Sequence, residues 1–388
     1  MSTASNKHPS VFGRIDWAVA FVALALLAIV LAPALAQVRE GGDRTQCLNN
    51  ARSLGLACLN FEAARRTMPL ASTQILTGKP GNFADPDPAG FSWLVMTIPY
   101  LNRDDLLPHY ERLAQTSNNF RKSPFDPEII SGEIDNVPTR DLFIWSFLCP
   151  SFIETLNAPA AEGGAAVPPN AGKLPAISNY HAMAGSHFVN AQGVGRMLPA
   201  ESLVAAADGR LLPTTPFEGT GAMPFPGMVG GQVTLRGVRM SQISDGAART
   251  FLFAETIEKE FASWMDGQVT WLVAAWPGTP DPPTLLPPVA EQRPQPLGWN
   301  VDQLPTNWTS LGKQLPPNAA EPKPPYLPAN RWSGGKDRAW GPSSLHGNVV
   351  THGFVDAHAE AISLNIDKNV YLHLATRAGR EVIPENAF

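Results

Sequence analysis

The residues best suited to chemistry gather near the C-terminus, in the stretch SSLHGNVVTHGFVDAHAEAIS from Ser343 to Ser363. It places His346, His352, Asp356 and His358 within thirteen residues. Imidazole and carboxylate groups at this density can hold a divalent metal ion or exchange protons in acid–base catalysis. The same groups can also be purely structural, because aspartate and histidine side chains hydrogen-bond the backbone of turns.

Apolar and polar residues alternate on either side of Asp356, which predicts two short strands joined by a turn. His352 and His358 would flank that turn, and as cross-strand neighbours they are the metal candidates of this stretch. Ala357 follows the aspartate, and a type I′ turn needs positive φ at both central residues. This alanine therefore favours a longer loop or another turn type, and we expect His346 and Asp356 to hydrogen-bond a loop or turn backbone.

Other sequence signals of catalysis are absent. The chain has no G-x-S-x-G elbow, no HExxH and no phosphate-binding glycine loop. Its net charge of -5 comes without a basic stripe that would follow a phosphate backbone. We therefore expect no enzymatic activity, no cofactor and no nucleic-acid partner.

The N-terminal part carries an uncharged run of twenty residues, Trp17 to Ala36, about the length of a membrane-spanning helix. Lys7 and Arg14 precede it, and positive residues hold the flanking segment on the cytoplasmic side. This predicts a cytoplasmic segment over residues 1–16, an inner-membrane helix over 17–36 and an exported domain over 37–388.

A cleaved signal peptide is the alternative for the same run. Ala34-Leu35-Ala36 forms an A-x-A site after the apolar core, and Pro33 could end the helix just before it. Cleavage there would release a soluble chain that begins at Gln37.

A helix is predicted to continue to about Arg66, because apolar residues recur at steps of three and four: Cys47, Ala51, Leu54, Cys58 and Phe61. On one helix Cys47 and Cys58 lie about 16 Å apart, too far for a disulfide. At most one of them pairs with Cys149, the remaining cysteine, and a Cys47–Cys149 bridge is our candidate. The cysteine spacings fit no zinc motif.

The other elements predict an α+β domain. Apolar, β-branched and aromatic runs predict strands at 141–150, 178–184, 249–255 and 263–276, and helical turns are expected over 91–113. An acidic start and a glycine stop predict a short helix over 367–378. Fifteen prolines between Pro277 and Pro328 predict an extended insertion over 277–330.

Six segments of the chain resemble, in order, motifs of one bacterial family. They are LAPALAQVREGGDRTQCLNNARSLGLACLNFEAARRTMP, FSWLVMTIPYLNRDDLLPHY, FLCPS, SNYHAMAG, MSQISDGAARTFLFAET and SLHGNVVTHGFVDAHAEAI. The family is DUF1559, whose N-terminus looks like a type IV pilin or a type II secretion pseudopilin. The resemblance implies a long N-terminal helix, membrane-spanning in its first half, packed on a mainly antiparallel β domain with irregular loop insertions. His346 and Asp356 would then belong to the family's C-terminal H-X9-DG segment.

The resemblance also implies roles near the N-terminus. In pilin-like proteins the helix proline follows an acidic residue by seventeen positions and the first mature phenylalanine by twenty-one; counting back from Pro33 reaches Asp16 and Phe12. Asp16 would meet the amino terminus of a neighbouring subunit, because a carboxylate in a membrane needs a cation. Val11 stands where the family's peptidase site has glycine, so processing by the prepilin peptidase stays open.

These expectations together describe a membrane-anchored, pseudopilin-like structural or binding protein of the bacterial cell envelope. Its partners would be the inner membrane and other pilin-like subunits or secretion-type machinery, and the bulk of the chain would be extracytoplasmic. The alternative is a secreted or periplasmic ligand-binding protein, for which the ten tryptophans suggest a glycan ligand.

Overall fold

The computed structural model describes residues 14–73, 90–120, 124, 126–130, 133–134, 137–152, 176–187, 189–191, 194–196, 203–205, 211–213, 217–229, 232–257, 263–267, 270–275, 329–330, 342–379 and 383–384. Phe12 and residues 277–328 of the predicted insertion lie outside this part. Contacts divide the chain into two compact units, Met1–Thr45 and Gln46–Phe388, and each is described by itself.

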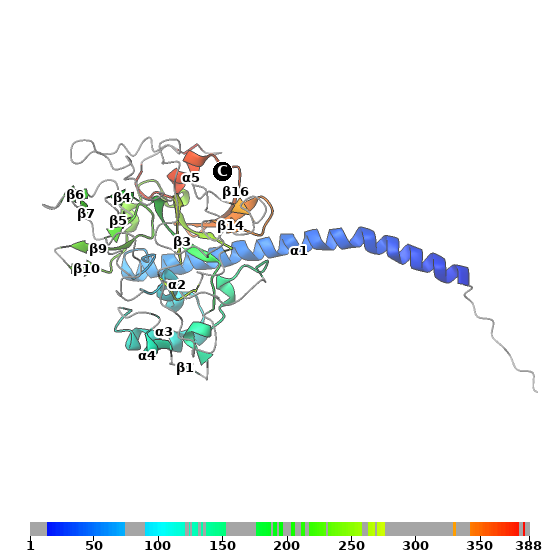
Figure 1. Ribbon diagram of the computed structural model, residues 1–388, viewed down its shortest axis with the longest axis horizontal. Helices are drawn as coiled ribbons and strands as arrows, with labels where there is room; N and C mark the ends of the chain where they lie inside the picture. Colours follow the sequence, from blue (N-terminus) through cyan, green and yellow to red (C-terminus); the bar gives the residue numbers. More distant parts are fainter. Residues whose placement is uncertain are drawn as a thin grey trace, which may run out of the picture. The chain divides into compact units, whose positions relative to one another are not determined.

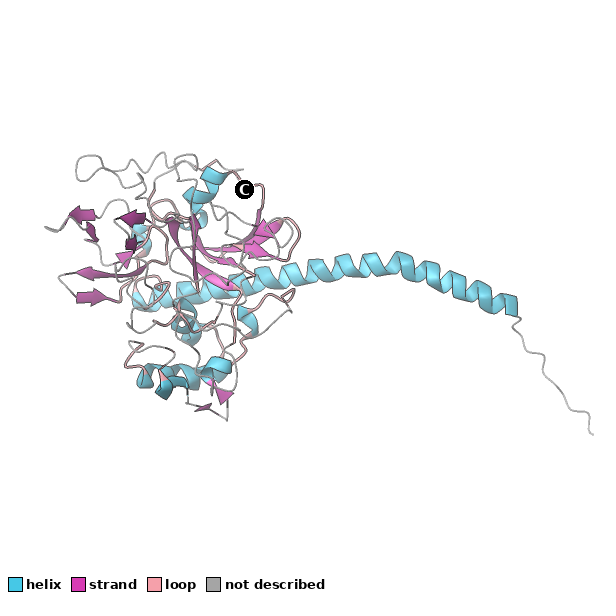
Figure 2. Ribbon diagram, in the orientation of Figure 1, coloured by secondary structure: helices cyan, strands magenta, loops and turns pink. Residues whose placement is uncertain are grey.

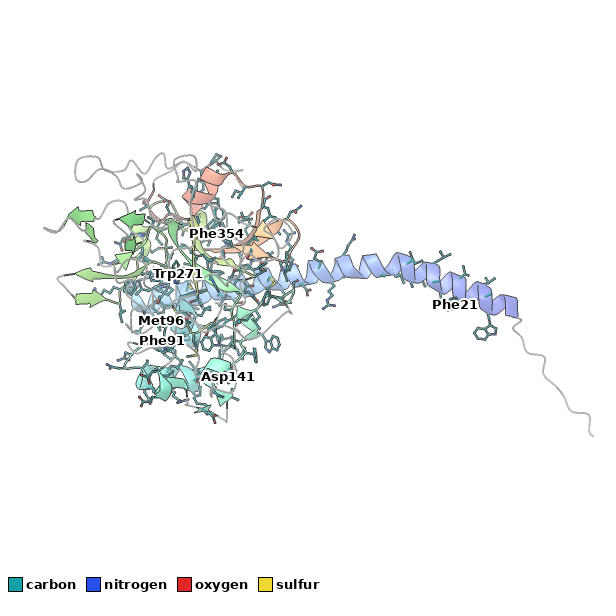
Figure 3. The ribbon with its side chains drawn as sticks, viewed as in Figure 1. Phe21, Phe91, Met96, Asp141, Trp271 and Phe354 are labelled. Atoms are coloured by element: carbon teal, nitrogen blue, oxygen red, sulfur yellow. A yellow bond between two sulfur atoms is a disulfide. The ribbon has the colours of Figure 1, made fainter. Side chains whose placement is uncertain are left out.

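The first unit consists of the N-terminal part of helix α1, which spans Arg14–Arg65 (Figure 1). The helix continues through Pro33 and Gly41 without a break. Residues 17–29 are all apolar and all exposed, including Phe21 at 75% (Figure 3). The side chains of Asp16 and Pro33 lie outside the described part. Among the residues described, no helix combines the length and the apolarity expected of a membrane span.

The second unit begins at Gln46 and contains the remaining elements. Its helices are α2 Trp93–Thr97, α3 Leu107–Thr116, α4 Pro127–Ile130 and α5 Lys368–Leu374, with 3-10 turns η1 Ile98–Tyr100, η2 Asp104–Leu106, η3 Thr139–Asp141, η4 Trp145–Phe147, η6 Met240–Gln242 and η7 Ala247–Arg249. Its strands are β1 Glu133–Ile134, β2 Val137–Pro138, β3 Tyr180–His187, β4 Val189–Ala191, β5 Val194–Arg196, β6 Leu203–Ala205, β7 Leu211–Pro213, β8 Phe217–Glu218, β9 Phe225–Val229, β10 Gln232–Thr234, β11 Phe251–Glu255, β12 Trp271–Ala275, β13 Ala329–Asn330, β14 Ser343–Ser344, β15 Val349–Phe354 and β16 Ala359–Ser363.

The centre of this unit is a five-stranded sheet in the order β12-β3-β11-β15-β16. Figure 2 shows the strands of the protein in magenta. The pairs β3–β11, β11–β15 and β15–β16 are antiparallel, whereas β12 runs parallel to β3. The α+β class is therefore confirmed, and the sheet is mainly antiparallel, as expected, with one parallel pair. The strands predicted at 178–184, 249–255 and 263–276 correspond to β3, β11 and β12.

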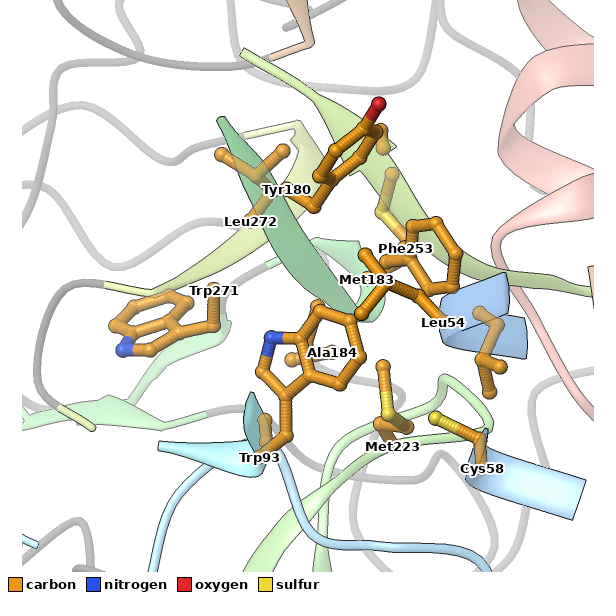
Figure 4. Packing of buried hydrophobic residues seen from close by; sticks show 14 of the residues in the cluster. Leu54, Cys58, Trp93, Tyr180, Met183, Ala184, Met223, Phe253, Trp271 and Leu272 are labelled. Atoms are coloured by element: carbon orange, nitrogen blue, oxygen red, sulfur yellow. The ribbon is translucent and has the colours of Figure 1, made fainter. Parts of the chain in front are cut away.

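The C-terminal part of α1 packs on this sheet through the apolar face that its sequence predicts. Leu54 lies near Met183 and Phe253 in the core, and Cys58 lies beside Met223 (Figure 4). The indole of Trp93 stacks on the ring of Phe253, with centroids 5.1 Å apart. Burying one such side chain stabilises a fold by about 1.5–3 kcal/mol, so this face holds α1 in place.

The prediction of a strand over residues 141–150 is wrong. This segment forms the end of η3 and the turn η4. Phe147 and Ile144 of this segment belong to the core, whereas Trp145 and Phe143 are exposed. Its backbone is bonded by other segments: the N–H of Asn179 donates to the carbonyl of Phe147 at 2.8 Å, and the N–H of Cys149 donates to the side chain of Asn179 at 2.9 Å. A strand propensity is overridden by these tertiary contacts.

The predicted C-terminal hairpin is formed by β15 and β16. The N–H of Phe354 donates to the carbonyl of His358 at 2.9 Å, and the N–H of Ala357 donates to the carbonyl of Phe354 at 3.0 Å. The loop therefore has three residues and places Ala357 in the left-handed region, at φ 69°. This is the longer loop that an alanine at this position favours.

Candidate functional site

Four donor groups from distant parts of the sequence meet in the interior of the second unit. They are the sulfurs of Cys47 and Cys149, a carboxylate oxygen of Glu255 and a ring nitrogen of His346, and all lie within 4.8 Å of one another. All four residues are buried. We call these residues the buried cluster.

Cys47 and Cys149 form a disulfide in this structure, with Cα atoms 5.3 Å apart. Cys47 lies on the buried face of α1, and Cys149 follows the turn η4. Cys58, about three turns further along the same face of α1, is a free buried thiol. Burial raises the pKa of the Cys58 thiol, so that this thiol stays protonated and unreactive.

His346 stands over the disulfide. Its Nε2 atom lies 3.2 Å from the Sγ of Cys47 and 3.2 Å from the Sγ of Cys149. The same nitrogen is 4.0 Å from Oε1 of Glu255. The segment between β14 and β15 is held in this position because the N–H of His346 donates to the hydroxyl of Ser344 at 3.1 Å.

Glu255 ends strand β11 and turns its carboxylate into the cluster. The Ser344 hydroxyl donates to Oε1 at 2.9 Å, and the N–H of Thr351 donates to Oε2 at 3.3 Å. Burial raises the pKa of Glu255 to about 7, and the hydrogen bonds from Ser344 and Thr351 oppose this shift. Near neutral pH the carboxyl group is therefore divided between its charged and neutral forms.

The segment around Asn179 and Tyr180 supports the cluster from the other side. The Tyr180 hydroxyl donates to the carbonyl of Cys47 at 2.9 Å, and the Asn179 amide donates to the carbonyl of Thr256 at 3.2 Å. Burial, together with the charge of Glu255, raises the pKa of Tyr180, so its hydroxyl remains a donor. The motifs FLCPS, SNYHAMAG and FLFAET therefore meet around the disulfide, together with the histidine of the C-terminal stretch.

Asp356 and His358 lie in the loop of the hairpin. The Asp356 carboxylate accepts a hydrogen bond from the backbone N–H of His358 at 3.1 Å, and its Oδ1 is 2.5 Å from Nδ1 of the same histidine. The imidazole of His358 also stacks on Phe354, with ring centroids 4.0 Å apart. Asp356 therefore binds the turn backbone, as its position in the sequence predicts.

His352 is fully buried in strand β15 and has different partners. Its register partner on β16 is Glu360, so His352 and His358 are not directly opposed. The Nδ1–H group donates to the carbonyl of Val350 at 3.0 Å, which leaves Nε2 to accept from the Tyr371 hydroxyl at 2.8 Å. Burial lowers the pKa of His352 to about 3, so the ring is neutral and both nitrogens are engaged. The structure offers no shared metal site for His352 and His358.

The H-X9-D spacing corresponds to the length of one strand. His346 precedes β15 by three residues, and Asp356 follows it by two. His346 and Asp356 therefore lie at opposite ends of β15, His346 at the disulfide and Asp356 at the turn. Sequence reasoning missed the pairing of His346 with the cysteines and with Glu255, because only the fold brings these segments together.

Comparisons with known proteins give a family match for this chain. The model of the family described as "Protein of unknown function (DUF1559)" matches residues 36–369. No curated protein and no solved structure matches the chain. The match covers most of the chain, including every residue of the buried cluster. The protein therefore belongs to the DUF1559 family.

Proposed function

We propose that the protein is a membrane-anchored, pseudopilin-like structural or binding protein of the bacterial cell envelope, without catalytic activity. The observation that carries the proposal is the apolar run of α1. Residues 17–29 are apolar on every face of the helix and exposed, with Ile29 at 68%. A helix that is apolar all round is stable where another apolar phase covers it. The hydrocarbon of the inner membrane is that phase in this proposal.

The charges around the run set the orientation. Lys7 and Arg14 precede it, and positive residues stay on the cytoplasmic side. The unit Gln46–Phe388 would then be extracytoplasmic, where a disulfide such as Cys47–Cys149 persists. This compartment is consistent with the buried disulfide.

Lateral assembly with other pilin-like subunits is the second part of the proposal. Asp16 would lie at the start of the apolar run and pair with the amino terminus of a neighbouring subunit. Phe12 would be the residue that carries this amine after processing. Pro33 would lie within the anchoring helix.

The test is fractionation of the full-length protein from its native host, followed by N-terminal sequencing. A membrane-bound chain that starts at Phe12 supports both anchoring and prepilin-type processing. A membrane-bound, unprocessed chain supports the anchor and contradicts assembly through a free Phe12 amine. A soluble chain that starts at Gln37 contradicts the anchor and identifies a secreted ligand-binding protein.

Assembly is tested separately with Asp16→Asn, which removes the charge and keeps the size of the side chain. Crosslinking in membranes should yield multimers with the native chain and monomers with the variant, while both chains remain in the membrane fraction. Equal crosslinking of the two chains would exclude the pairing of Asp16 with a neighbour.

A further inference from the structure

The buried cluster has more polar groups than a structural disulfide needs. A disulfide packs against apolar neighbours, whereas a buried imidazole and a buried carboxylate each cost free energy that hydrogen bonds must offset. His346 and Glu255 nevertheless converge on Cys47 and Cys149, which places four metal-binding atoms within 4.8 Å of one another. Two thiolates, one imidazole and one carboxylate form a ligand set that suits Zn²⁺.

We propose that reduction of the Cys47–Cys149 disulfide converts the buried cluster into a binding site for a thiophilic divalent cation of the Zn²⁺ type. The four ligands are the two sulfurs, Nε2 of His346 and Oε1 of Glu255. The site alternates between an oxidised state without metal and a reduced state with metal. This inference is independent of membrane anchoring.

The geometry is close to that of a bound site. Zn²⁺ bonds of about 2.3 Å to sulfur and about 2.0–2.2 Å to nitrogen and oxygen place tetrahedral donors about 3.3–3.8 Å apart. The His346 nitrogen is 3.2 Å from both sulfurs and 4.0 Å from Oε1 of Glu255. The two sulfurs must move apart, and breaking the bond between them permits this. The carboxylate of Glu255, 4.0 Å from Nε2 of His346, must move slightly closer to the other donors.

The outer contacts of the cluster already orient the ligands. The Ser344 hydroxyl donates to Oε1 of Glu255 and accepts from the backbone N–H of His346. The N–H of Thr351 donates to Oε2 of Glu255. The carbonyl of Cys47 is held by the Tyr180 hydroxyl. Such partners fix the direction of metal ligands and raise the affinity of a site.

Reduction of the Cys47–Cys149 disulfide needs an external dithiol as the reductant. The dithiol gives two electrons and two protons to the disulfide and becomes a disulfide itself, which leaves two protein thiols. Binding of the cation then releases both thiol protons to solvent, and any proton on Glu255, while His346 binds as the neutral ring. Two thiolates and one carboxylate around a divalent cation leave one net negative charge, which the donors on Ser344 and Thr351 stabilise.

The experiment uses the full-length protein in detergent, reduced with a water-soluble phosphine and titrated with Co²⁺ without oxygen. We expect one Co²⁺ per reduced chain, with thiolate-to-cobalt charge-transfer bands and the ligand-field bands of a tetrahedral site, and displacement by Zn²⁺. The oxidised protein should show none of these bands. Reduced protein without the bands would overturn the proposal, whether it keeps its fold or unfolds.

Variants separate the folded site from adventitious binding by thiols. Cys47→Ser and Cys149→Ser should abolish the charge-transfer bands, and His346→Gln and Glu255→Gln should weaken Co²⁺ binding about tenfold or more. Cys58→Ser is the matched control, because it removes a buried thiol outside the cluster, and it should bind as the native chain does. Binding that is insensitive to Glu255→Gln, or lost in Cys58→Ser, would contradict the assignment.

Discussion

Gly55 of α1 lies directly against Ala357 in the β15–β16 loop: a Cβ atom at position 55 would come within 2.9 Å of the Cα of Ala357. The backbones of the helix and of the hairpin loop are in direct contact, and neither can move aside as a flexible side chain would.

Gly55→Ala should destabilise the second unit. The new methyl group meets backbone atoms, and overpacking of this kind costs about 1–3 kcal/mol, against a gain of at most about 1 kcal/mol in helix propensity. We expect a net loss of about 1–2 kcal/mol in the free energy of unfolding, measured with urea. Gly42→Ala is the control, because its Cβ would meet nothing within 4 Å. Equal effects of the two substitutions would refute the contact.

Ala357→Gly should stabilise the same unit. Ala357 has a φ of 69°, a conformation that costs an L-residue about 1–2 kcal/mol and costs glycine almost nothing. Glycine's greater freedom in the unfolded chain offsets part of this, so we expect a gain of about 0.5–1 kcal/mol. Ala359→Gly in strand β16 is the matched control and should be destabilising. A loss of stability in Ala357→Gly would show that the loop conformation is assigned wrongly.

Loss of the disulfide should destabilise the oxidised protein more than any of these changes. The Cys47–Cys149 bond joins residues 102 positions apart, and closing a loop of this size contributes about 2–5 kcal/mol. Cys149→Ser should lower the free energy of unfolding by that amount, whereas Cys58→Ser should leave the reductant sensitivity unchanged. Intact mass with and without reductant, after alkylation, gives the direct count: two additional labelled thiols are expected on reduction, and none would disprove the bond.

Acid should destabilise the protein through His352. Its pKa is about 3 in the folded state and about 6.5 in the unfolded state, so between these values only the unfolded chain binds the proton. The contribution is fully favourable above about pH 6.5 and falls by at most about 1.4 kcal/mol per unit as the pH drops toward 3. Glu255, whose pKa is raised, acts with the opposite sign. His352→Gln removes the His352 contribution alone, so urea unfolding at pH 4 to 7 should show a shallower loss of stability with acid in the variant, and parallel curves would contradict the assignment.

If the apolar run Trp17 to Ala36 anchors the chain as proposed, a charge in this run should weaken membrane binding. Leu24→Arg places a guanidinium among exposed apolar side chains, at a cost of about 2.5–3.5 kcal/mol in a bilayer centre. We expect a large part of the variant to leave the membrane fraction, with the unfolding of the second unit unchanged. Val38→Arg is the matched control, since Val38 is 73% exposed and lies outside the run. If both variants partition as the native chain does, the run is not the anchor.

Local patterns of the sequence predict the elements whose form depends on the spacing of residues close together in the chain. The spacing of Cys47, Ala51, Leu54 and Cys58 predicts the buried face of α1, and alternation around Asp356 predicts the hairpin. The strand prediction for residues 141–150 is wrong because an apolar composition does not show which groups bind the backbone. The side chain of Asn179, from another segment, binds their backbone where a neighbouring strand would have been needed.

The buried cluster is the part of the structure that the sequence does not predict. Glu255 and His346 are ninety-one positions apart, and each is equally compatible with a role at the surface. A usable signal was present: Glu255 ends a run of four apolar residues, Phe251 to Ala254, and a carboxylate in such a buried strand requires partners.

The position of Cys47 gives the crosslink a mechanical meaning. Cys47 is the second residue of the unit Gln46–Phe388. Tension applied through the N-terminal part of the chain therefore reaches the disulfide before it reaches the part of α1 that follows Cys47. While the bond is intact, pulling loads a covalent link to Cys149, and the contacts of Leu54 and Cys58 carry no force. Once the disulfide is reduced, the same force separates α1 from the sheet one turn at a time. The redox state of the disulfide then sets how much load the protein bears.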